Sequence, residues 1–291
     1  MPINSDICYY SFNTYLRERY RERVQKITLD AGLTCPNRDG TKGTGGCIYC
    51  DNAGSGSNAS KSFPSITAQA HNSMAYLTKR YKARKFIAYL QSFCNTYAPL
   101  EKLKNMYNEA AALPGVVGLA VATRPDCLTA DVLDLLAGYT ERVEVWLELG
   151  MQTIHNRTLQ TINRGHAYED FLNGFELARH FPLKICLHAI IGLPGETGED
   201  VRATSLEVAR LKPEGLKLHS LYVTSGTAIE KLYQSGTYKP LTRDAYVSQA
   251  CDFLEQVPPA TIIQRLTGDP DRNELVAPAW ALDKHRTINL I

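Results

Sequence analysis

The sequence lacks the features of a secreted or membrane-anchored protein. Its N-terminus, MPINSDICYYSFNTYLRERYRERVQK, does not have the basic-then-apolar order of a signal peptide. No stretch approaches the roughly 18 consecutive apolar residues that a membrane span needs. We therefore expect a cytoplasmic protein without a membrane partner.

Net charge is also nearly absent, because the chain has 32 Lys and Arg residues and 30 Asp and Glu residues. A bulk electrostatic field is therefore excluded as a means of attracting nucleic acid, and any such site must come from local clustering. The run TKRYKARK (78–85) is the better candidate for phosphate contacts. The run YLRERYRERVQK (15–26) alternates with Glu and is more typical of a solvated, salt-bridged helix face.

Paired cysteine spacing is missing from most of the chain. Five of the eight cysteines are scattered, as expected for small apolar packing residues: Cys8, Cys94, Cys127, Cys186 and Cys251. The other three, Cys35, Cys47 and Cys50, lie in the loop-forming stretch TCPNRDGTKGTGGCIYC (34–50). This set is one thiol short of the four that a structural metal site usually needs.

Several centres fit three thiols. Zinc with three protein ligands is possible, as is a thioredoxin-type redox pair at Cys47 and Cys50 or a set of unrelated free cysteines. The interpretation that we favour is a [4Fe–4S] cluster with three thiolate ligands and one iron open to a substrate or cofactor.

Short β-rich runs alternate with segments of helical period. Strands are expected at 24–30, 85–93, 115–123, 142–150, 183–193 and 215–223, with a further strand at 261–268. This alternation predicts a parallel sheet of βαβ units, either doubly wound or an incomplete TIM-like barrel. In both folds chemistry gathers at the carboxyl ends of the strands, where the cysteine loop follows the first strand. We expect an N-terminal extension (1–23), a core (24–224) and a C-terminal elaboration of the same domain (225–291).

The cysteine loop resembles the cluster loop of radical S-adenosylmethionine (SAM) enzymes. Their most frequent spacing is CxxxCxxC, whereas this chain has Cx11CxxC, which is similar to the long-spaced variant of Elongator subunit three. The stretch CPNRDG…GGCIYC resembles the bacterial YhcC/YtqA-type family, and the resemblance covers nearly the whole chain. It implies an α/β incomplete TIM-like (β/α)6 barrel that binds SAM and carries a [4Fe–4S] cluster on Cys35, Cys47 and Cys50.

The resemblance also implies SAM contacts at the first three strand ends. Tyr49 occupies the aromatic position near the SAM adenine. Gln91 and Ser92, in YLQSF, stand where many relatives carry a Gly-Gly-Glu motif for the methionine amine. Thr123, in ATRPD, falls on the same face at the end of the third strand.

The later strands supply the remaining candidates. By resemblance, Gln152 meets the ribose and Arg164 meets the methionyl carboxylate, for which a planar guanidinium is well suited. Glu148 is an acid within an apolar strand, so we expect it to have a polar partner at the cofactor or substrate. His188 and His219 are candidates for the same face, although a lone strand histidine is also compatible with a core position.

The activity implied by the resemblance is reductive cleavage of SAM to a 5′-deoxyadenosyl radical. Similarity to Elongator subunit three implies a tRNA substrate, modified at carbon 5 of the wobble uridine, and a reductant such as flavodoxin or ferredoxin. Two alternatives remain: a radical SAM enzyme with a small-molecule substrate, and a non-catalytic, zinc-stabilised RNA-binding module.

Overall fold

The computed structural model describes residues 8–51, 54, 63 and 65–291. The first seven residues of the predicted N-terminal extension lie outside this part of the chain. Within the described residues, no helix is both long enough and apolar enough to cross a membrane.

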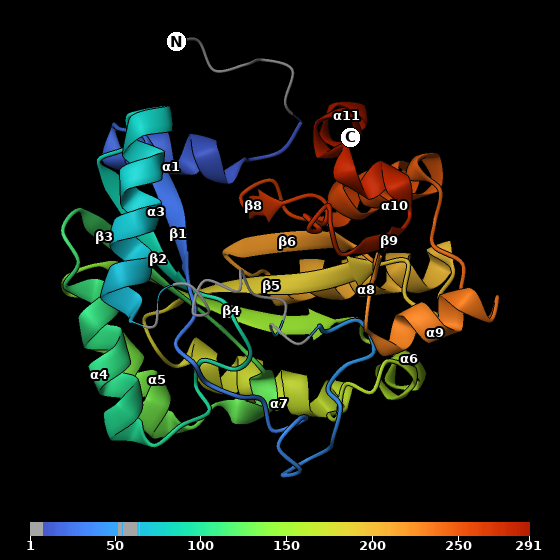
Figure 1. Cartoon of the computed structure of the whole chain (residues 1–291), viewed down its shortest axis with the longest axis horizontal. Coiled ribbons are helices and arrows are strands. Elements are labelled where there is room, and N and C mark those ends of the chain that lie inside the picture. Colours follow the sequence, from blue (N-terminus) through green and yellow to red (C-terminus); the bar gives the residue numbers. More distant parts are fainter. Residues whose placement is uncertain (1–7, 52–53, 55–62, 64) are drawn as a thin grey trace.

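A single curled sheet of seven parallel strands forms the centre of the molecule (Figure 1). Its order is β1-β2-β3-β4-β5-β6-β8, so each strand pairs with its predecessor and the sheet winds in one direction. The strands are β1 (Val24–Leu29), β2 (Lys85–Leu90), β3 (Val116–Thr123), β4 (Glu144–Gln152), β5 (Lys184–Ile191), β6 (Gly215–Ser220) and β8 (Ile262–Arg265). The predicted incomplete barrel is confirmed, and it is one strand wider than six because β8 pairs parallel to β6.

Helices cover the convex side of the sheet and bury its outward-facing side chains. The larger ones are α3 (Ile66–Tyr81), α4 (Leu100–Ala111), α5 (Ala130–Ala137), α7 (Tyr168–Arg179), α8 (Gly198–Leu211) and α10 (Arg243–Gln256). Helix α5 starts after Thr129, whose hydroxyl accepts a hydrogen bond from the Val132 N–H and caps the helix. The extensive core between helices and sheet fixes the strand ends that carry the site.

The remaining elements are short and lie around the barrel. They are α1 (Phe12–Tyr20), α6 (Asn156–Thr161), α9 (Ala228–Gln234), α11 (Lys284–Leu290), the 3-10 turns η1 (Pro125–Cys127) and η2 (Ala279–Leu282), and the antiparallel pair β7 (Val223–Thr224) and β9 (Leu275–Ala277). The cysteine loop follows β1, as predicted, and reaches the carboxyl ends of the strands.

The open side of the barrel is narrowed by contacts between its two edge strands. The Lys26 ammonium on β1 donates to Gln264 Oε1 on β8 at 2.7 Å, and α1 contacts both strands. Below this contact the rings of Phe12 and Tyr15 pack edge-on against Trp146 inside the barrel. The amino ends of the strands are therefore filled by an aromatic cluster, which leaves chemistry to the carboxyl ends.

Candidate metal and cofactor site

The cysteine loop is a folded unit that is held by its own backbone. Cys47 is buried, whereas Cys35 and Cys50 are half-buried. The Cys50 N–H donates to the Cys47 carbonyl at 2.9 Å, which fixes the CxxC turn. Arg38, within the loop, donates to the carbonyls of Cys50 (2.7 Å) and Asp51 (2.6 Å). Gly46 has φ 76°, and a Cβ there would lie 2.7 Å from Arg38 Nε, so glycine lets the chain pass.

Two helices from later in the chain position this loop. Ile48 N–H donates to the carbonyl of Ile162, after α6, at 3.0 Å, and the Ile48 carbonyl accepts from the Ile229 N–H of α9 at 2.9 Å. The side-chain amide of Asn37 donates to the Asn163 carbonyl at 2.5 Å, while Asn163 Nδ2 donates back to Gly46 at 2.8 Å. The position of the thiols therefore depends on segments more than a hundred residues away in sequence.

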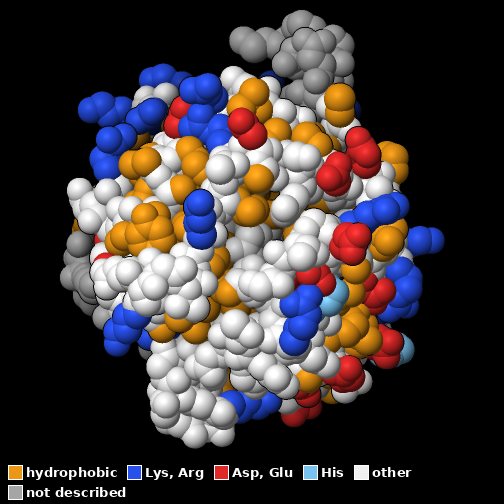
Figure 2. Space-filling view, turned by 90° about the vertical axis from the view of Figure 1, so that its right-hand side faces the viewer, with side chains coloured by type: hydrophobic (Ala, Val, Ile, Leu, Met, Phe, Trp, Pro, Cys, Tyr) orange, Lys and Arg blue, Asp and Glu red, His pale blue; other side chains and the backbone are white. Residues whose placement is uncertain are grey.

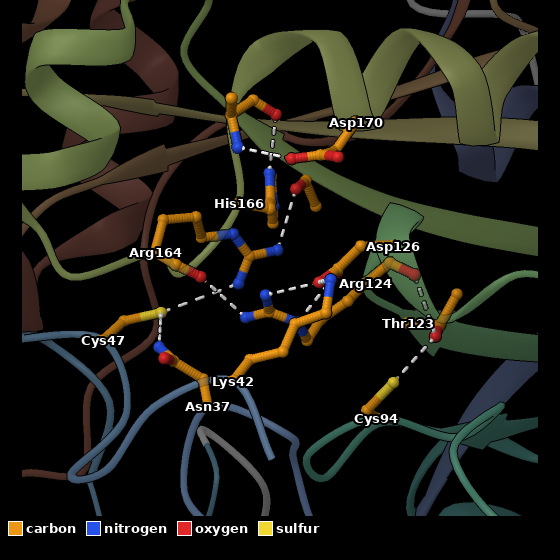
Figure 3. Close-up of polar contacts among 12 residues, drawn as sticks. Asn37, Lys42, Cys47, Cys94, Thr123, Arg124, Asp126, Arg164, His166 and Asp170 are labelled. Carbon is orange, nitrogen blue, oxygen red and sulfur yellow. Dashed lines mark hydrogen bonds and ion pairs between the residues drawn. The ribbon is translucent and has the colours of Figure 1, made fainter. Parts of the chain in front are cut away.

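Arg164 connects the cysteine loop to the end of β4 (Figure 3). Its Nη1 lies 3.6 Å from Cys47 Sγ, and its Nη2 donates to the Gly150 carbonyl at 2.8 Å. A Cβ on Gly150 would lie 2.6 Å from Gln152 Nε2 and 2.7 Å from Arg164 Nη2. The side chains of these two predicted residues therefore pack against Gly150, where a larger residue would clash with them. Burial alone would lower the pKa of Arg164, but the neighbouring Cys47 and Tyr49 raise it above its usual value. The guanidinium therefore stays charged.

A second buried guanidinium supports the first. Arg124 Nη1 donates to the Arg164 carbonyl at 2.8 Å, and its Nε and Nη2 form a two-pronged contact with Asp126 at 2.9 Å each. Lys42, which belongs to the cysteine loop, places its Nζ 2.7 Å from Asp126 Oδ2 (Figure 3). Burial would raise the pKa of Asp126, but Arg124 and Lys42 lower it to about 2. These ion pairs and hydrogen bonds connect the cysteine loop, the end of β3 and Arg164.

Glu148 lies inside the barrel among three cationic or protonatable side chains. It is fully buried; Lys26 Nζ and His188 Nε2 each lie 2.9 Å from its carboxylate, and Lys217 also pairs with it. Burial would raise the pKa of Glu148, but the two lysines and His188 hold it well below its usual range. The prediction of a polar partner for Glu148 is thus met within the chain, which leaves its contact with cofactor or substrate as a proposal.

The two strand histidines lie next to each other above Glu148. The rings of His188 and His219 are 5.4 Å apart, and His219 Nδ1 lies 3.4 Å from an Arg265 nitrogen. Burial, followed by Lys217, lowers the pKa of His188 to about 4 despite Glu148. Burial and then Arg265 hold the pKa of His219 well below its usual value. Both imidazoles are therefore neutral at pH 7.

These two histidines make the fold sensitive to acid. Their pKa values are lowered on folding, so the unfolded chain binds protons near pH 6.5 while the folded chain does not. Stability should fall as the pH drops from 6.5 to 4.5, by about 1.4 kcal/mol per pH unit for each histidine. Urea denaturation across this range checks the slope. His188→Gln should reduce the slope of unfolding free energy against pH by about 1.4 kcal/mol per pH unit, the contribution of one histidine. An unchanged slope would contradict the lowered pKa of His188.

The remaining predicted residues occupy the first strand ends. The Gln91 N–H donates to the Leu29 carbonyl at 3.2 Å, which places it beside the start of the cysteine loop. The Thr123 hydroxyl lies 2.5 Å from Thr96 Oγ1 and 3.1 Å from Cys94 Sγ. Thr123 is therefore engaged in a buried network under the loop that follows β2, and its contact with SAM stays a prediction.

Several buried polar atoms of the candidate residues have no hydrogen-bond partner. They are Tyr49 OH, Ser92 Oγ, Arg164 Nε and His219 Nε2. Unpaired buried polar atoms are costly, and they suit a polar ligand that would satisfy them. These orphaned atoms, together with the three thiols and the adjacent guanidiniums, fit an anionic cluster and a polar cofactor.

The thiols are not arranged around a single point. Among the residues that the structure describes, no three His, Cys, Asp or Glu side chains form a group that could hold one metal ion. A zinc ion needs ligand atoms at about 2.0–2.3 Å from one centre. A four-iron cluster takes each thiolate at a different iron, so its ligands need not converge on one point.

Sequence reasoning missed several partners in this site. Asn37 and Asn163 were not singled out, although both lie in the loop-forming stretches CPNRDG and NRGH. Lys26 and Lys217 were also missed, and the signal was available: each is a lysine inside a predicted buried strand, which demands a charged partner.

Two family models place the chain among the radical SAM proteins. Residues 38–208 match the Radical SAM superfamily, and residues 213–291 match the Radical_SAM C-terminal domain. The chain belongs to the radical SAM superfamily, as the sequence predicted. It is 40% identical over 288 residues to the uncharacterised protein YtqA of Bacillus subtilis, which covers 99% of this chain and 89% of YtqA.

More distant similarities extend to proteins with named roles. A tRNA uridine(34) acetyltransferase of Dehalococcoides mccartyi is 34% identical over 157 residues, which are 53% of this chain and 33% of that protein. The structure of the archaeal Methanocaldococcus infernus Elp3 superposes with a TM-score of 0.63 at 17% identity, covering 93% of this chain and 64% of Elp3. This last likeness confirms the fold. Radical SAM proteins use a [4Fe–4S] cluster, SAM and a reductant.

Proposed function

We propose that this radical SAM enzyme modifies the side chain at carbon 5 of a tRNA wobble uridine. The observation that carries the proposal is the 34% identity, over about half of the chain, to a tRNA uridine(34) acetyltransferase. A wobble base flipped out of its stack would enter at the carboxyl ends of the strands.

In this proposal Cys35, Cys47 and Cys50 would hold a [4Fe–4S] cluster. When bound, the cluster and SAM would supply the radical chemistry that removes hydrogen from a C–H bond of the substrate. The protein binds and orients both molecules and excludes water.

The side chains around the cluster suit these roles. Arg164, whose guanidinium is buried and whose Nε is unpaired, would donate from that nitrogen to the methionyl carboxylate. Gln152, beside it, would contact the ribose, and Tyr49 would pack near the adenine. His188, His219 and Glu148 lie deeper in the barrel and would contact SAM or substrate, whereas Gln91, Ser92 and Thr123 would border the methionine amine.

The test compares modified nucleosides in total tRNA from cells with and without the gene. We expect a wobble uridine whose mass changes when the gene is absent and returns on complementation with the natural chain. Cys47→Ala should not complement. Arg164→Lys should complement poorly, because lysine keeps the charge but loses the planar fork.

Two outcomes would redirect the proposal. If every wobble uridine is unchanged while the purified protein still cleaves SAM, the substrate is not tRNA, and a small molecule takes its place. If Cys47→Ala complements as well as the natural chain, the modification does not depend on the cluster.

A further inference from the structure

The molecule carries a concentrated basic surface at the end of the barrel opposite the cysteine loop. Residues 17–23 and 79–85 together hold nine Lys and Arg side chains and only two carboxylates, in a chain whose net charge is +2. The rest of the chain is therefore net acidic. We call the exposed cations of these two ranges the basic patch.

The fold brings the two ranges together. Val24 pairs with Lys85 in register at the start of β1 and β2, so the residues before each strand are neighbours. Arg23 Nη1 donates to the Tyr81 carbonyl at 3.4 Å, and the Arg23 guanidinium lies 5.3 Å from the centre of the Tyr81 ring. Figure 1 shows α1 beside the C-terminal end of α3 at the upper left.

Few of these charges are neutralised locally. Lys85 pairs with Glu22 at 3.2 Å, and Arg19 pairs with Glu144 at 3.2 Å. Arg17, Arg21 and Lys82 are exposed and have no ion-pair partner among the described residues. By contrast, Lys and Arg are interspersed with Asp and Glu over the right half of Figure 2, which shows the face that lies at the right-hand side of Figure 1.

Aromatic rings lie among these cations. Tyr76 is 54% exposed on α3, and the Arg80 guanidinium lies 5.8 Å from its ring centre and 5.2 Å from that of Tyr81. Exposed aromatic rings beside arginines form a platform on which bases stack, whereas an acidic protein would need only the charges. The combination therefore favours a nucleic acid over an acidic protein surface.

The geometry points to RNA binding at the basic patch, and we propose that this patch holds the phosphate backbone of the tRNA away from its modified base. This inference rests on the proposed function and adds a second contact to it. The six residues of β1 separate the patch from the cysteine loop, which is about 20 Å at 3.3 Å per residue.

The test measures binding of fluorescently labelled tRNA to the full-length holoenzyme by anisotropy, without SAM or reductant, between 50 and 200 mM salt. The triple variant Lys79→Gln, Arg80→Gln, Lys82→Gln should bind about tenfold or more weakly at low salt, with the slope of log K against log salt reduced by about two. Tyr76→Ala should weaken binding about fivefold or more. The matched control, Arg142→Gln, Arg202→Gln, Arg286→Gln, removes three exposed cations elsewhere and should keep most of the affinity.

Three results would overturn the inference. The patch triple could bind tRNA as the natural chain does, or both triples could lose the same affinity, which would indicate bulk charge alone. The natural chain could also bind anionic phosphatidylserine vesicles through the patch and not bind tRNA. Because no turnover is measured, tRNA that binds at the patch but keeps its nucleosides unchanged would contradict the proposed function and leave this inference standing.

Discussion

Cys47→Ala is expected to yield protein without the brown colour and the absorbance near 400 nm of a [4Fe–4S] cluster. The natural chain, purified anaerobically, should hold about four irons, and the variant should lose most of them. Cys47 is the buried member of the set and the one that Arg164 contacts, so its loss removes a ligand from the interior of the site. Iron analysis and visible absorbance check the result.

Cys251→Ala is the matched control, because this half-buried cysteine lies on α10, away from the cysteine loop. It should keep both iron and colour. A natural chain that is colourless and holds stoichiometric zinc would contradict the cluster and support the zinc-stabilised RNA-binding alternative. Iron retained by Cys47→Ala would show that other residues hold the cluster.

Glu148→Gln is expected to destabilise the fold by about 3–5 kcal/mol. The change removes the carboxylate on which Lys26 and Lys217 both depend, and it leaves two ammonium groups inside the barrel without a counter-charge. Glutamine is nearly the same size, so the loss comes from charge and not from a cavity. Urea denaturation at pH 7 measures the difference in the free energy of unfolding.

An exposed ion pair provides the comparison for Glu148. Asp269 pairs with Lys284 at 2.8 Å, and both side chains are largely open to solvent. Asp269→Asn should cost less than about 1 kcal/mol, as is usual for surface pairs. Equal losses in the two variants would mean that the network around Glu148 contributes no more than a surface contact.

Much of the barrel follows from local sequence. The apolar runs at 85–93 and 183–193 predicted β2 and β5 correctly, because strands that are covered on both faces need continuous apolar residues. The segment of helical period between the first two strands forms α3, which begins after the capping Ser65. The seventh strand was expected as part of a C-terminal elaboration, because β8 has four residues and nothing local indicates that it pairs with β6.

The site was predictable where one motif contains its parts. Cys35, Cys47 and Cys50 lie in a single loop, and the end of β4 lies close to Arg164 in sequence. A lysine inside an apolar strand, such as Lys26, shows that a charged partner is needed, but the identity of each supporting partner was not predictable, because these contacts join distant segments. Lys26 meets Glu148 across 122 residues, and Asn37 meets Asn163 across 126. Such pairings arise from the closing of the sheet, so no spacing within the sequence encodes them.

The backbone bonds at Ile48 bear on how this chain could be divided or recombined. A chain ending at Thr224 would keep all three cysteines and the strands β1 to β6, yet it would lose the Ile229 N–H that bonds the loop and the strand β8 that pairs with β6. The predicted boundary after residue 224 is therefore a poor place to exchange modules. A hybrid that borrows the cysteine loop should inherit residues 213–291 with it, since this segment supplies the Ile229 N–H that bonds the loop.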